Sequence, residues 1–252
     1  MRPRFPGKPR LGGPLAGHVD YILSRYSKAV VASTIVVGLI YSTSILLALL
    51  PSGVDLVVWV GILVMLVYLA VVIELAGNMA QELGSGEAAL YLATPLSRVQ
   101  YTLAWTASLA LPTIASYTAS LLTPLLVVSP GLVARDVVWG LALGVSGEIL
   151  YYTVIITGLA IILRRKNLVS IIGLMLLIMG PLVIVLTAII YASITGTDVN
   201  PDTLKSLIGV FHPIALLKEE TLDFTAPIIY SLTSSLLLLA LVARYAARSL
   251  EV

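Results

Sequence analysis

The sequence has no cysteine and few charged residues. Asp, Glu, Lys and Arg make up 11% of the 252 residues, whereas a soluble domain carries about 25%. Hydrophobic residues make up 59%, so the chain has too little polar side chain to cover a water-exposed surface, and we expect a lipid bilayer to be its solvent. The lack of cysteine excludes disulfides, thiol catalysis and cysteine metal sites.

Motifs for catalysis and nucleotide binding are also missing. The sequence contains no GxxxxGK[ST] phosphate loop, no HExxH zinc motif and no GxSxG nucleophile elbow. Its two histidines, His18 and His212, lie far apart in sequence, so no metal site is predicted. We therefore expect no catalytic residue, no bound cofactor and no nucleic-acid partner in this chain.

Six long apolar stretches predict an all-α, polytopic membrane protein. Each approaches or exceeds the ~20 residues that a helix needs to cross ~30 Å of hydrocarbon, and none alternates as a membrane β-strand does. Residues 1–17 are predicted to be a disordered basic tail on the membrane surface, and residues 18–252 a single transmembrane domain. The expected spans are residues 29–50, 56–79, 99–128, 137–163, 168–195 and 226–245.

An amphipathic segment precedes the first span. In residues 18–28 (HVDYILSRYSK), apolar side chains recur at helical spacing and the charged ones fall largely on the other side. This pattern is typical of an interfacial helix lying on the inner leaflet. A simple extension of the first span into water is the alternative.

The basic residues predict which end of the protein faces the cytoplasm. With six spans, both termini lie on one side of the membrane. Of the 15 Lys and Arg residues, only Arg135, Lys205 and Lys218 fall on the opposite side. Because basic residues collect on the cytoplasmic side, we expect a protein of the cell membrane with both termini in the cytoplasm.

The polar interruption between the second and third spans, residues 82–98 (ELGSGEAALYLATPLSR), predicts a short helix between two long ones. Gly84 and Gly86 are expected to end the helix before it, because glycine is costly inside a helix and turns freely outside one. Ser85 is expected to cap the short helix, with Glu87 in its first turn, where a carboxylate suits the helix dipole.

The short helix is expected to cover about two turns, residues 87–93, with Leu90 on its apolar side. It should end before Pro95, because a proline disfavours the helical conformation in the residue that precedes it. Thr94 is then expected to cap the third span, with Pro95 at the first helical position and Arg98 one turn later.

This order of parts resembles the cytoplasmic coupling segment of the type-2 ABC transporter permeases, the six-span membrane subunits of ATP-driven exporters. The position of the segment between the second and third of six spans adds to the resemblance. A surface linker with ordinary helix caps is the alternative. The residues that carry the resemblance are Glu82, Gly86, Glu87, Leu92, Thr94, Pro95, Leu96, Ser97 and Arg98.

The resemblance implies a divided machine. A separate cassette ATPase, which holds ATP and Mg²⁺, would bind under the permease, and a second copy or a paralogue of the permease would complete a dimer in membrane lipid. The short helix would insert into a groove on the ATPase. The residues expected to take part in this coupling are Glu82, Gly86, Glu87, Leu90, Thr94, Pro95 and Arg98.

A second unusual segment lies between the fifth and sixth spans. Residues 206–217 (SLIGVFHPIALL) are too few to cross a bilayer and too apolar for a solvated loop. They predict a re-entrant hairpin broken at His212-Pro213, and the resembling exporters carry such a segment there. A short amphipathic helix on the outer headgroups is the alternative, and we expect His212 to be an interfacial polar residue.

Glu148 is the ionisable residue in the middle part of the fourth span, where a charged carboxylate costs on the order of 3 kcal/mol or more. It is either a polar point on the substrate path or a proton site, or else a glutamate hydrogen-bonded between helices. Glu74, nearer the inner end of the second span, is predicted to pair with a base such as Arg98.

Backbone signals predict where the spans bend and pack. Pro112 and Gly180-Pro181 are the expected kinks, since proline removes a helix hydrogen bond. Gly140 and Gly144 form a GxxxG pattern, which favours close helix packing.

Three other functions compete with the permease. An ion-coupled secondary transporter would use Glu148 but should show midplane binding groups and internal repeats. An intramembrane lipid enzyme would need clustered polar residues at one membrane face, and none are present in the sequence. A non-transporting membrane subunit is the third.

Overall fold

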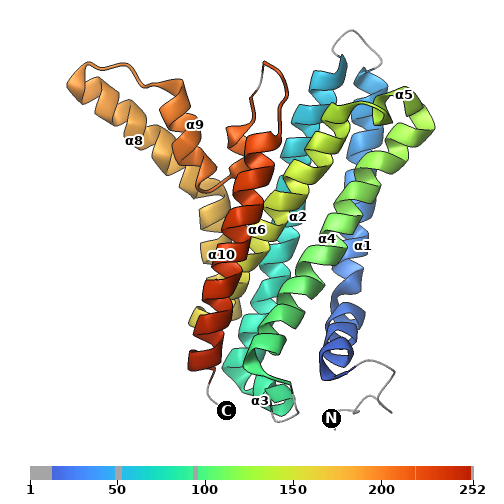
Figure 1. Ribbon diagram of the computed structural model, residues 1–252, viewed down its shortest axis with the longest axis vertical. Helices are drawn as coiled ribbons and strands as arrows, with labels where there is room; N and C mark the ends of the chain where they lie inside the picture. The colour runs from blue at the N-terminus through green and yellow to red at the C-terminus, as the bar shows by residue number, and fades with distance from the viewer. Residues whose placement is uncertain (1–12, 49–52, 93–95, 219, 251–252) are drawn as a thin grey trace.

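The structure, a computed structural model, describes residues 13–48, 53–92, 96–218 and 220–250. These residues form helices joined by short connections (Figure 1). In chain order the helices are α1 (Pro14–Ala48), α2 (Gly53–Ser85), α3 (Glu87–Leu92), α4 (Arg98–Val128), α5 (Pro130–Val133), α6 (Asp136–Leu163), α7 (Lys166–Leu174), the π-helix η1 (Met175–Met179), α8 (Gly180–Thr195), α9 (Pro201–Gly209), the 3-10 helix η2 (Pro213–Leu216) and α10 (Thr225–Ser249).

Five helical segments are long and apolar enough to cross a membrane: those of α2, α4, α6, the α7–η1–α8 run and α10. A sixth is reached if the bent helix α1 counts as one span. Within α1, Leu15–Tyr26 meets Lys28–Thr43 at 57°, close to the boundary predicted between an interfacial helix and the first span. The prediction of an all-α, multi-span membrane protein is confirmed.

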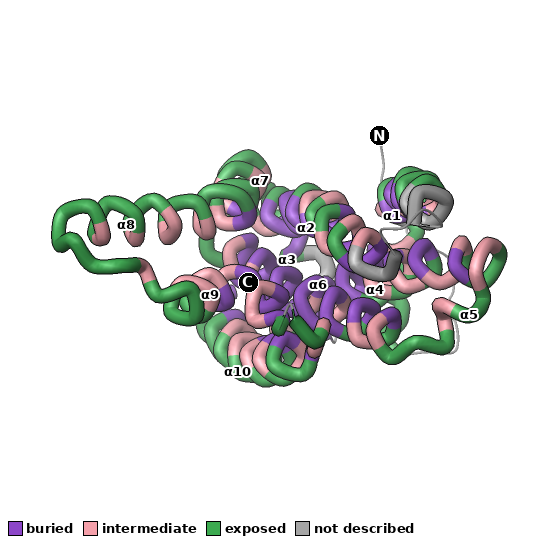
Figure 2. The backbone as a smooth tube through the Cα atoms, turned by 90° about the horizontal axis from the view of Figure 1, so that it is seen from above, coloured by how far each residue is buried: buried purple, intermediate pink, exposed green. Residues whose placement is uncertain are grey.

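Helix α6 lies in the middle of the bundle, and Figure 2 shows it largely buried among its neighbours. It packs against α2, α4 and α10. Glycines on α6 permit a close contact with Phe224, the residue before α10, since a Cβ on Gly140 would lie 2.7 Å, and one on Gly144 2.9 Å, from its ring. The GxxxG pair therefore forms a groove for one aromatic ring at the start of α10.

Helices α1, α2 and α4 are held together by buried hydroxyl groups as well as apolar contacts. The hydroxyls of Tyr41 and Tyr117 lie 3.0 Å apart, as do those of Tyr68 and Ser120. The Ser120 hydroxyl also lies 3.2 Å from the carbonyl oxygen of Thr34. In an apolar solvent such bonds add to packing, because lipid competes for apolar contacts but not for hydrogen bonds.

The helix of the fifth span is interrupted near Pro181, where the sequence predicts a kink. Pro181 has no N–H, and the π-helix η1 directly precedes it, between α7 and α8. Beyond this break α8 leans away from the bundle toward α9 (Figure 1). No residue of α8 is buried, so its apolar side chains face the surroundings.

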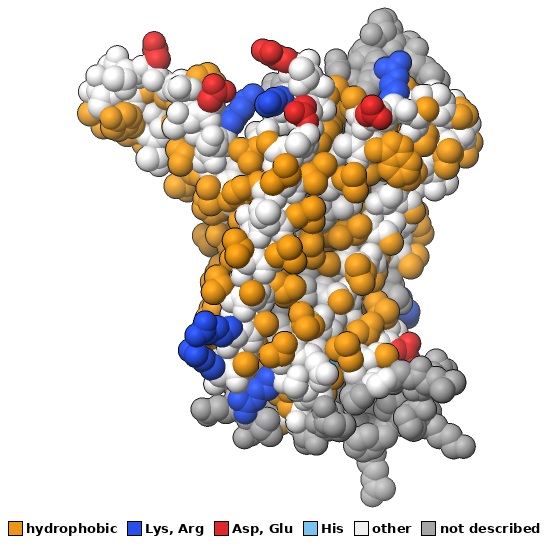
Figure 3. Space-filling view, in the orientation of Figure 1, with side chains coloured by type: hydrophobic (Ala, Val, Ile, Leu, Met, Phe, Trp, Pro, Cys, Tyr) orange, Lys and Arg blue, Asp and Glu red, His pale blue; other side chains and the backbone are white. Residues whose placement is uncertain are grey.

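The two ends of the bundle differ. One end, here named the α3 end, carries α3, the start of α1 and the close of α10, and the opposite end, the α9 end, carries α5 and α9 (Figure 1). Figure 3 shows a wide band of hydrophobic side chains between two charged ends. This pattern agrees with a bundle that spans a bilayer along its long axis.

Candidate functional site

The short helix α3 forms where the sequence predicts it. Helix α2 runs through Ser85, and Gly86, with φ +80°, makes the left-handed turn that separates α2 from α3 before Glu87. The Ser85 hydroxyl accepts a bond from the Glu87 N–H at 3.4 Å. Gly86 alone ends the helix, whereas Gly84 serves a different purpose: a Cβ there would lie 2.2 Å from the carbonyl oxygen of Arg164.

Among the described side chains of α3 and the turn before it, the exposed ones are polar or small. Gly86, Glu87 and Ala89 are exposed, while Ala88 packs into the core. The side chain of Leu90, and the whole of Thr94 and Pro95, lie outside the described residues.

The start of α4 differs from the prediction. Pro95 does not open this helix: α4 begins at Arg98, and Ser97 is its N-cap. The Ser97 hydroxyl accepts from the Gln100 N–H at 3.2 Å, and the Gln100 side chain accepts from the Ser97 N–H at 2.9 Å. This reciprocal capping box satisfies two N–H groups that a helix start leaves free.

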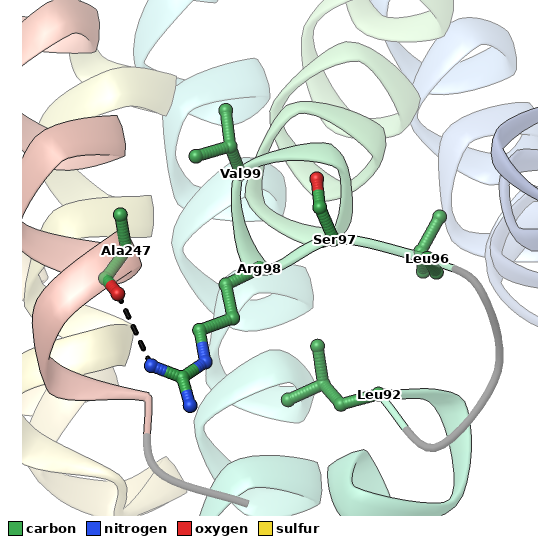
Figure 4. Close-up of a pocket in the computed structure, with 6 residues that line it drawn as sticks. All are labelled: Leu92, Leu96, Ser97, Arg98, Val99 and Ala247. Atoms are coloured by element: carbon green, nitrogen blue, oxygen red, sulfur yellow. Dashed lines mark hydrogen bonds between the residues drawn. The ribbon is translucent and has the colours of Figure 1, made fainter.

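Arg98 joins α4 to the end of α10. Its guanidinium donates to the carbonyl oxygen of Ala247 at 3.1 Å (Figure 4). Arg164, at the end of α6, donates in the same way to Ser249 at 2.7 Å. Beside Arg98 is an open cavity of about 420 Å³, lined by Leu92, Leu96, Ser97, Arg98, Val99 and Ala247 (Figure 4).

Glu82 lies one turn before α3 and faces inward. It is 2% exposed; one carboxylate oxygen lies 3.5 Å from the Arg25 guanidinium and the other accepts from the Tyr101 hydroxyl at 3.4 Å. Arg25 also bonds the Tyr21 hydroxyl and lies over the rings of Tyr21 and Tyr26. Glu82 therefore connects the Leu15–Tyr26 part of α1 to α2 and α4, and the exposed surface near α3 is left to other residues.

Glu74 pairs with a base, as predicted, but that base is Lys166 and not Arg98. Glu74 lies 2.6 Å from Lys166 and accepts from the Ser170 hydroxyl at 3.3 Å, so it binds the start of α7. The second span faces α7 at this height, and the side chain of Arg98 is engaged by α10.

Glu148 and His212 form a buried pair. Glu148 is fully buried on α6, and its Oε1 lies 2.6 Å from His212 Nδ1. Its other oxygen, Oε2, accepts from the backbone N–H of Ile214 at 2.7 Å. Of the alternatives for Glu148, the structure shows a carboxyl group hydrogen-bonded inside the protein, and His212, 8% exposed, is a buried partner and not an interfacial residue.

The second nitrogen of His212 reaches the break in the fifth span. His212 Nε2 lies 2.8 Å from the carbonyl oxygen of Leu177 and 3.2 Å from the Tyr152 hydroxyl. In a regular α-helix the Leu177 carbonyl oxygen would accept a hydrogen bond from the N–H of residue 181. Residue 181 is proline, which has no N–H to donate. One imidazole therefore links α6, the η1–α8 break and the start of η2.

The segment that carries His212 has the predicted break. Helix α9 ends at Gly209, the chain turns, and η2 begins at Pro213. His212, Pro213 and Ile214 are buried, and the Tyr151 hydroxyl donates to the carbonyl oxygen of Val210 at 2.6 Å. The segment thus turns inward against α6 and α10.

The sites around α3 and Glu148 offer few metal ligands. Among the side chains that the structure describes, no three of His, Asp and Glu come together as a metal site. No protein-family model and no curated protein matches the sequence.

Proposed function

We propose that this chain is the membrane-spanning permease subunit of a type-2 ABC transporter, an exporter driven by a separate ATPase subunit. The observation that carries the proposal is α3: a two-turn helix that a single left-handed glycine sets between two spanning helices, with an exposed glutamate in its first turn. The exposed Glu87 and Ala89 of this helix are available to a partner.

The position of α3 supports this role. It lies at the end of the molecule where α1 starts and α10 closes (Figure 1). That end holds Arg164, Arg165 and Lys166, and a concentration of basic residues supports a cytoplasmic orientation of this end. In this orientation α3 and the cavity beside Arg98 face the compartment that supplies ATP.

The contacts around α3 provide a route for transmitting force. Gly84 lies against the Arg164 carbonyl, Arg98 is bonded to α10, and Glu82 is bonded to Arg25 on α1. A partner that moves α3 therefore pulls on α1, α4, α6 and α10 together. This linkage suits a rigid-body change between inward-open and outward-open states when two ATPases close on ATP and Mg²⁺.

The unburied helices suit a paired permease. In α10 and in the α7–η1–α8 span, only 17% of the residues in the apolar stretch that could cross the membrane are buried, against 67% in α6. A second copy or a paralogue would cover part of this surface, and membrane lipid the rest.

The test is co-purification. The tagged chain is expressed with cassette ATPases from the same genome, extracted in mild detergent, and assayed for bound ATPase and ATP hydrolysis. Glu87→Arg should weaken the complex at least tenfold while membrane insertion is unchanged, because it reverses the charge on the exposed side of α3. Glu220→Arg, an exposed change between η2 and α10, is the matched control and should leave the complex intact.

A stable lone protein that binds no ATPase, or a complex that Glu87→Arg does not weaken, contradicts the coupling role. The buried Glu148–His212 pair favours an ion-coupled secondary transporter as the second candidate, because such transporters carry ionisable groups inside the membrane. Proteoliposomes holding this chain alone would then show transport driven by a pH gradient.

A further inference from the structure

The hydrogen positions on His212 follow from its partners. The Leu177 carbonyl oxygen can only accept a hydrogen bond, so at 2.8 Å His212 Nε2 must carry the hydrogen. Nδ1 then faces Glu148 Oε1 at 2.6 Å, and that contact also requires one hydrogen between the two atoms. The second glutamate oxygen is already an acceptor, from the Ile214 N–H.

This count leaves one exchangeable proton in the pair. With that proton the pair is neutral overall, either as carboxylate and imidazolium or as carboxylic acid and imidazole. Without it, two lone pairs face each other and a net negative charge is buried. With a second proton, two hydrogens face each other and the charge is positive. A buried site strongly disfavours both charged forms.

The surroundings add no competing charge that the structure records. The ionisable groups around the pair are Tyr152, on α6 and 3.2 Å from Nε2, and Tyr151, which binds the Val210 carbonyl. Tyr230 on α10 touches Tyr151 by ring contact. From η1 the pair receives a backbone carbonyl, and the flanking cations, Lys205 on α9 and Lys218 after η2, are at least partly exposed to solvent.

We infer that Glu148 and His212 together bind a single proton, and that this proton fastens residues 210–217 against α6 and the break in the fifth span. When the proton leaves to water through His212, the more exposed partner, the Glu148–His212 bond is lost. The inward-turned segment is then held by fewer polar contacts and can move with α9. The inference does not depend on the class of transporter.

A glutamine at position 148 separates this role from simple packing. Its amide oxygen can accept from the Ile214 N–H while its NH₂ group donates to the bare Nδ1 of neutral His212. Glu148→Gln therefore reproduces the protonated pair with hydrogens that do not dissociate. In the variant, residues 210–217 should stay packed against α6 at alkaline pH, where the natural pair loses its proton and releases them.

Two features of the chain make the measurement direct. Because it has no cysteine, a spin-label pair can be placed at Leu207→Cys on α9 and Leu143→Cys on α6, both of them exposed positions. Because it has only two histidines, ¹⁵N-histidine NMR can report the protonation of His212. His18→Gln, at the α3 end, removes the other imidazole and is the matched control.

The full-length protein is titrated in nanodiscs from about pH 5 to pH 10, a range that spans the histidine transition. We expect Nε2 to carry hydrogen throughout, and the label distance to lengthen as the shared proton is lost. The ratio of fastened to released protein should fall about tenfold per pH unit above the midpoint, since one proton is exchanged. His18→Gln should keep this transition. Glu148→Gln should abolish the lengthening of the label distance at alkaline pH.

Three results would overturn the inference. The first is a label distance that stays constant while His212 loses its proton, because the pair would then be a passive packing contact. The second is an alkaline transition of unchanged size in Glu148→Gln. The third is an NMR signal that places the hydrogen of neutral His212 on Nδ1 and not on Nε2.

Discussion

The groove formed by Gly140 and Gly144 gives a sharp test of how α6 and α10 pack. Phe224 is 3% exposed, and its ring occupies this groove. Replacing a buried Phe with Ala removes its contacts and leaves a cavity, which costs about 3–5 kcal/mol in a well-packed site. We expect Phe224→Ala to cost about 3 kcal/mol, the low end, because the ring lies near the end of the bundle, where lipid can enter.

For a chain of this length, a loss of that size lowers the thermal midpoint by roughly 6–12 °C. The measurement is thermal unfolding of the purified protein in detergent, followed by intrinsic fluorescence. Leu236→Ala is the matched control, since it removes an apolar side chain from the same helix at a position that is 66% exposed. It should move the midpoint by less than about 2 °C, as surface changes do.

The reverse change, Gly140→Ala, completes a double-mutant cycle. In the natural chain the new Cβ would lie 2.7 Å from the Phe224 ring, and such overpacking costs about 1–3 kcal/mol. In the Phe224→Ala background the ring is gone, and alanine is a better helix former than glycine by about 1 kcal/mol. The sign of the effect should therefore reverse. An equal cost in both backgrounds would refute the placement of the ring between these glycines.

Two further predictions concern charged groups near the ends of the bundle. Arg25→Ala and Glu82→Gln should show a coupling energy above about 1 kcal/mol, the upper value for exposed pairs, in a double-mutant cycle on thermal stability, because the Glu82 side chain is only 3% exposed; a smaller coupling would mean that solvent at the 49% exposed Arg25 side chain screens the pair. Asp223, outside the spans, accepts hydrogen bonds from the side chain and the backbone N–H of Thr225, which lower the pKa of its carboxyl. Its contribution to stability is present above the ordinary aspartate pKa and is lost as pH falls through the lowered one. Asp223→Asn should therefore flatten the acid side of a plot of thermal midpoint against pH, and an unchanged acid slope would count against a stabilising role of the Asp223–Thr225 hydrogen bonds.

Some helix bounds could be predicted from the sequence because they depend on local information, although α2 runs six residues beyond its expected end at residue 79, to Ser85. The span expected at residues 137–163 is observed at Asp136–Leu163, and the short helix expected to begin at Glu87 does so. Apolar length, glycine and proline set these limits. The sequence contains a signal for the N-cap of α4 at Ser97, because a serine followed three residues later by glutamine, here Gln100, is a capping-box pattern.

The partners of the buried charges could not be predicted, because they depend on how the helices are rotated. Glu74 binds Lys166 on α7, and nothing in the local sequence distinguishes that lysine from Arg98. Glu148 and His212 are 64 residues apart. A signal was nevertheless present: each is a rare ionisable residue inside an apolar stretch, and a buried ionisable residue requires a partner.

Glu82 and Glu148, the buried glutamates among the described residues, share a physical role. Glu82 holds the Leu15–Tyr26 part of α1, and Glu148 holds the start of η2, so each attaches a short segment to the long helices of the bundle. Lipid solvates an apolar side chain as well as the protein core does, so apolar contact alone gives such a segment little reason to stay against the bundle. A buried carboxyl group provides that reason, because leaving it unpaired is costly. The same cost makes each attachment dependent on charge: Glu82 keeps its partner while Arg25 is within reach, and Glu148 keeps its partner only while the pair holds its proton.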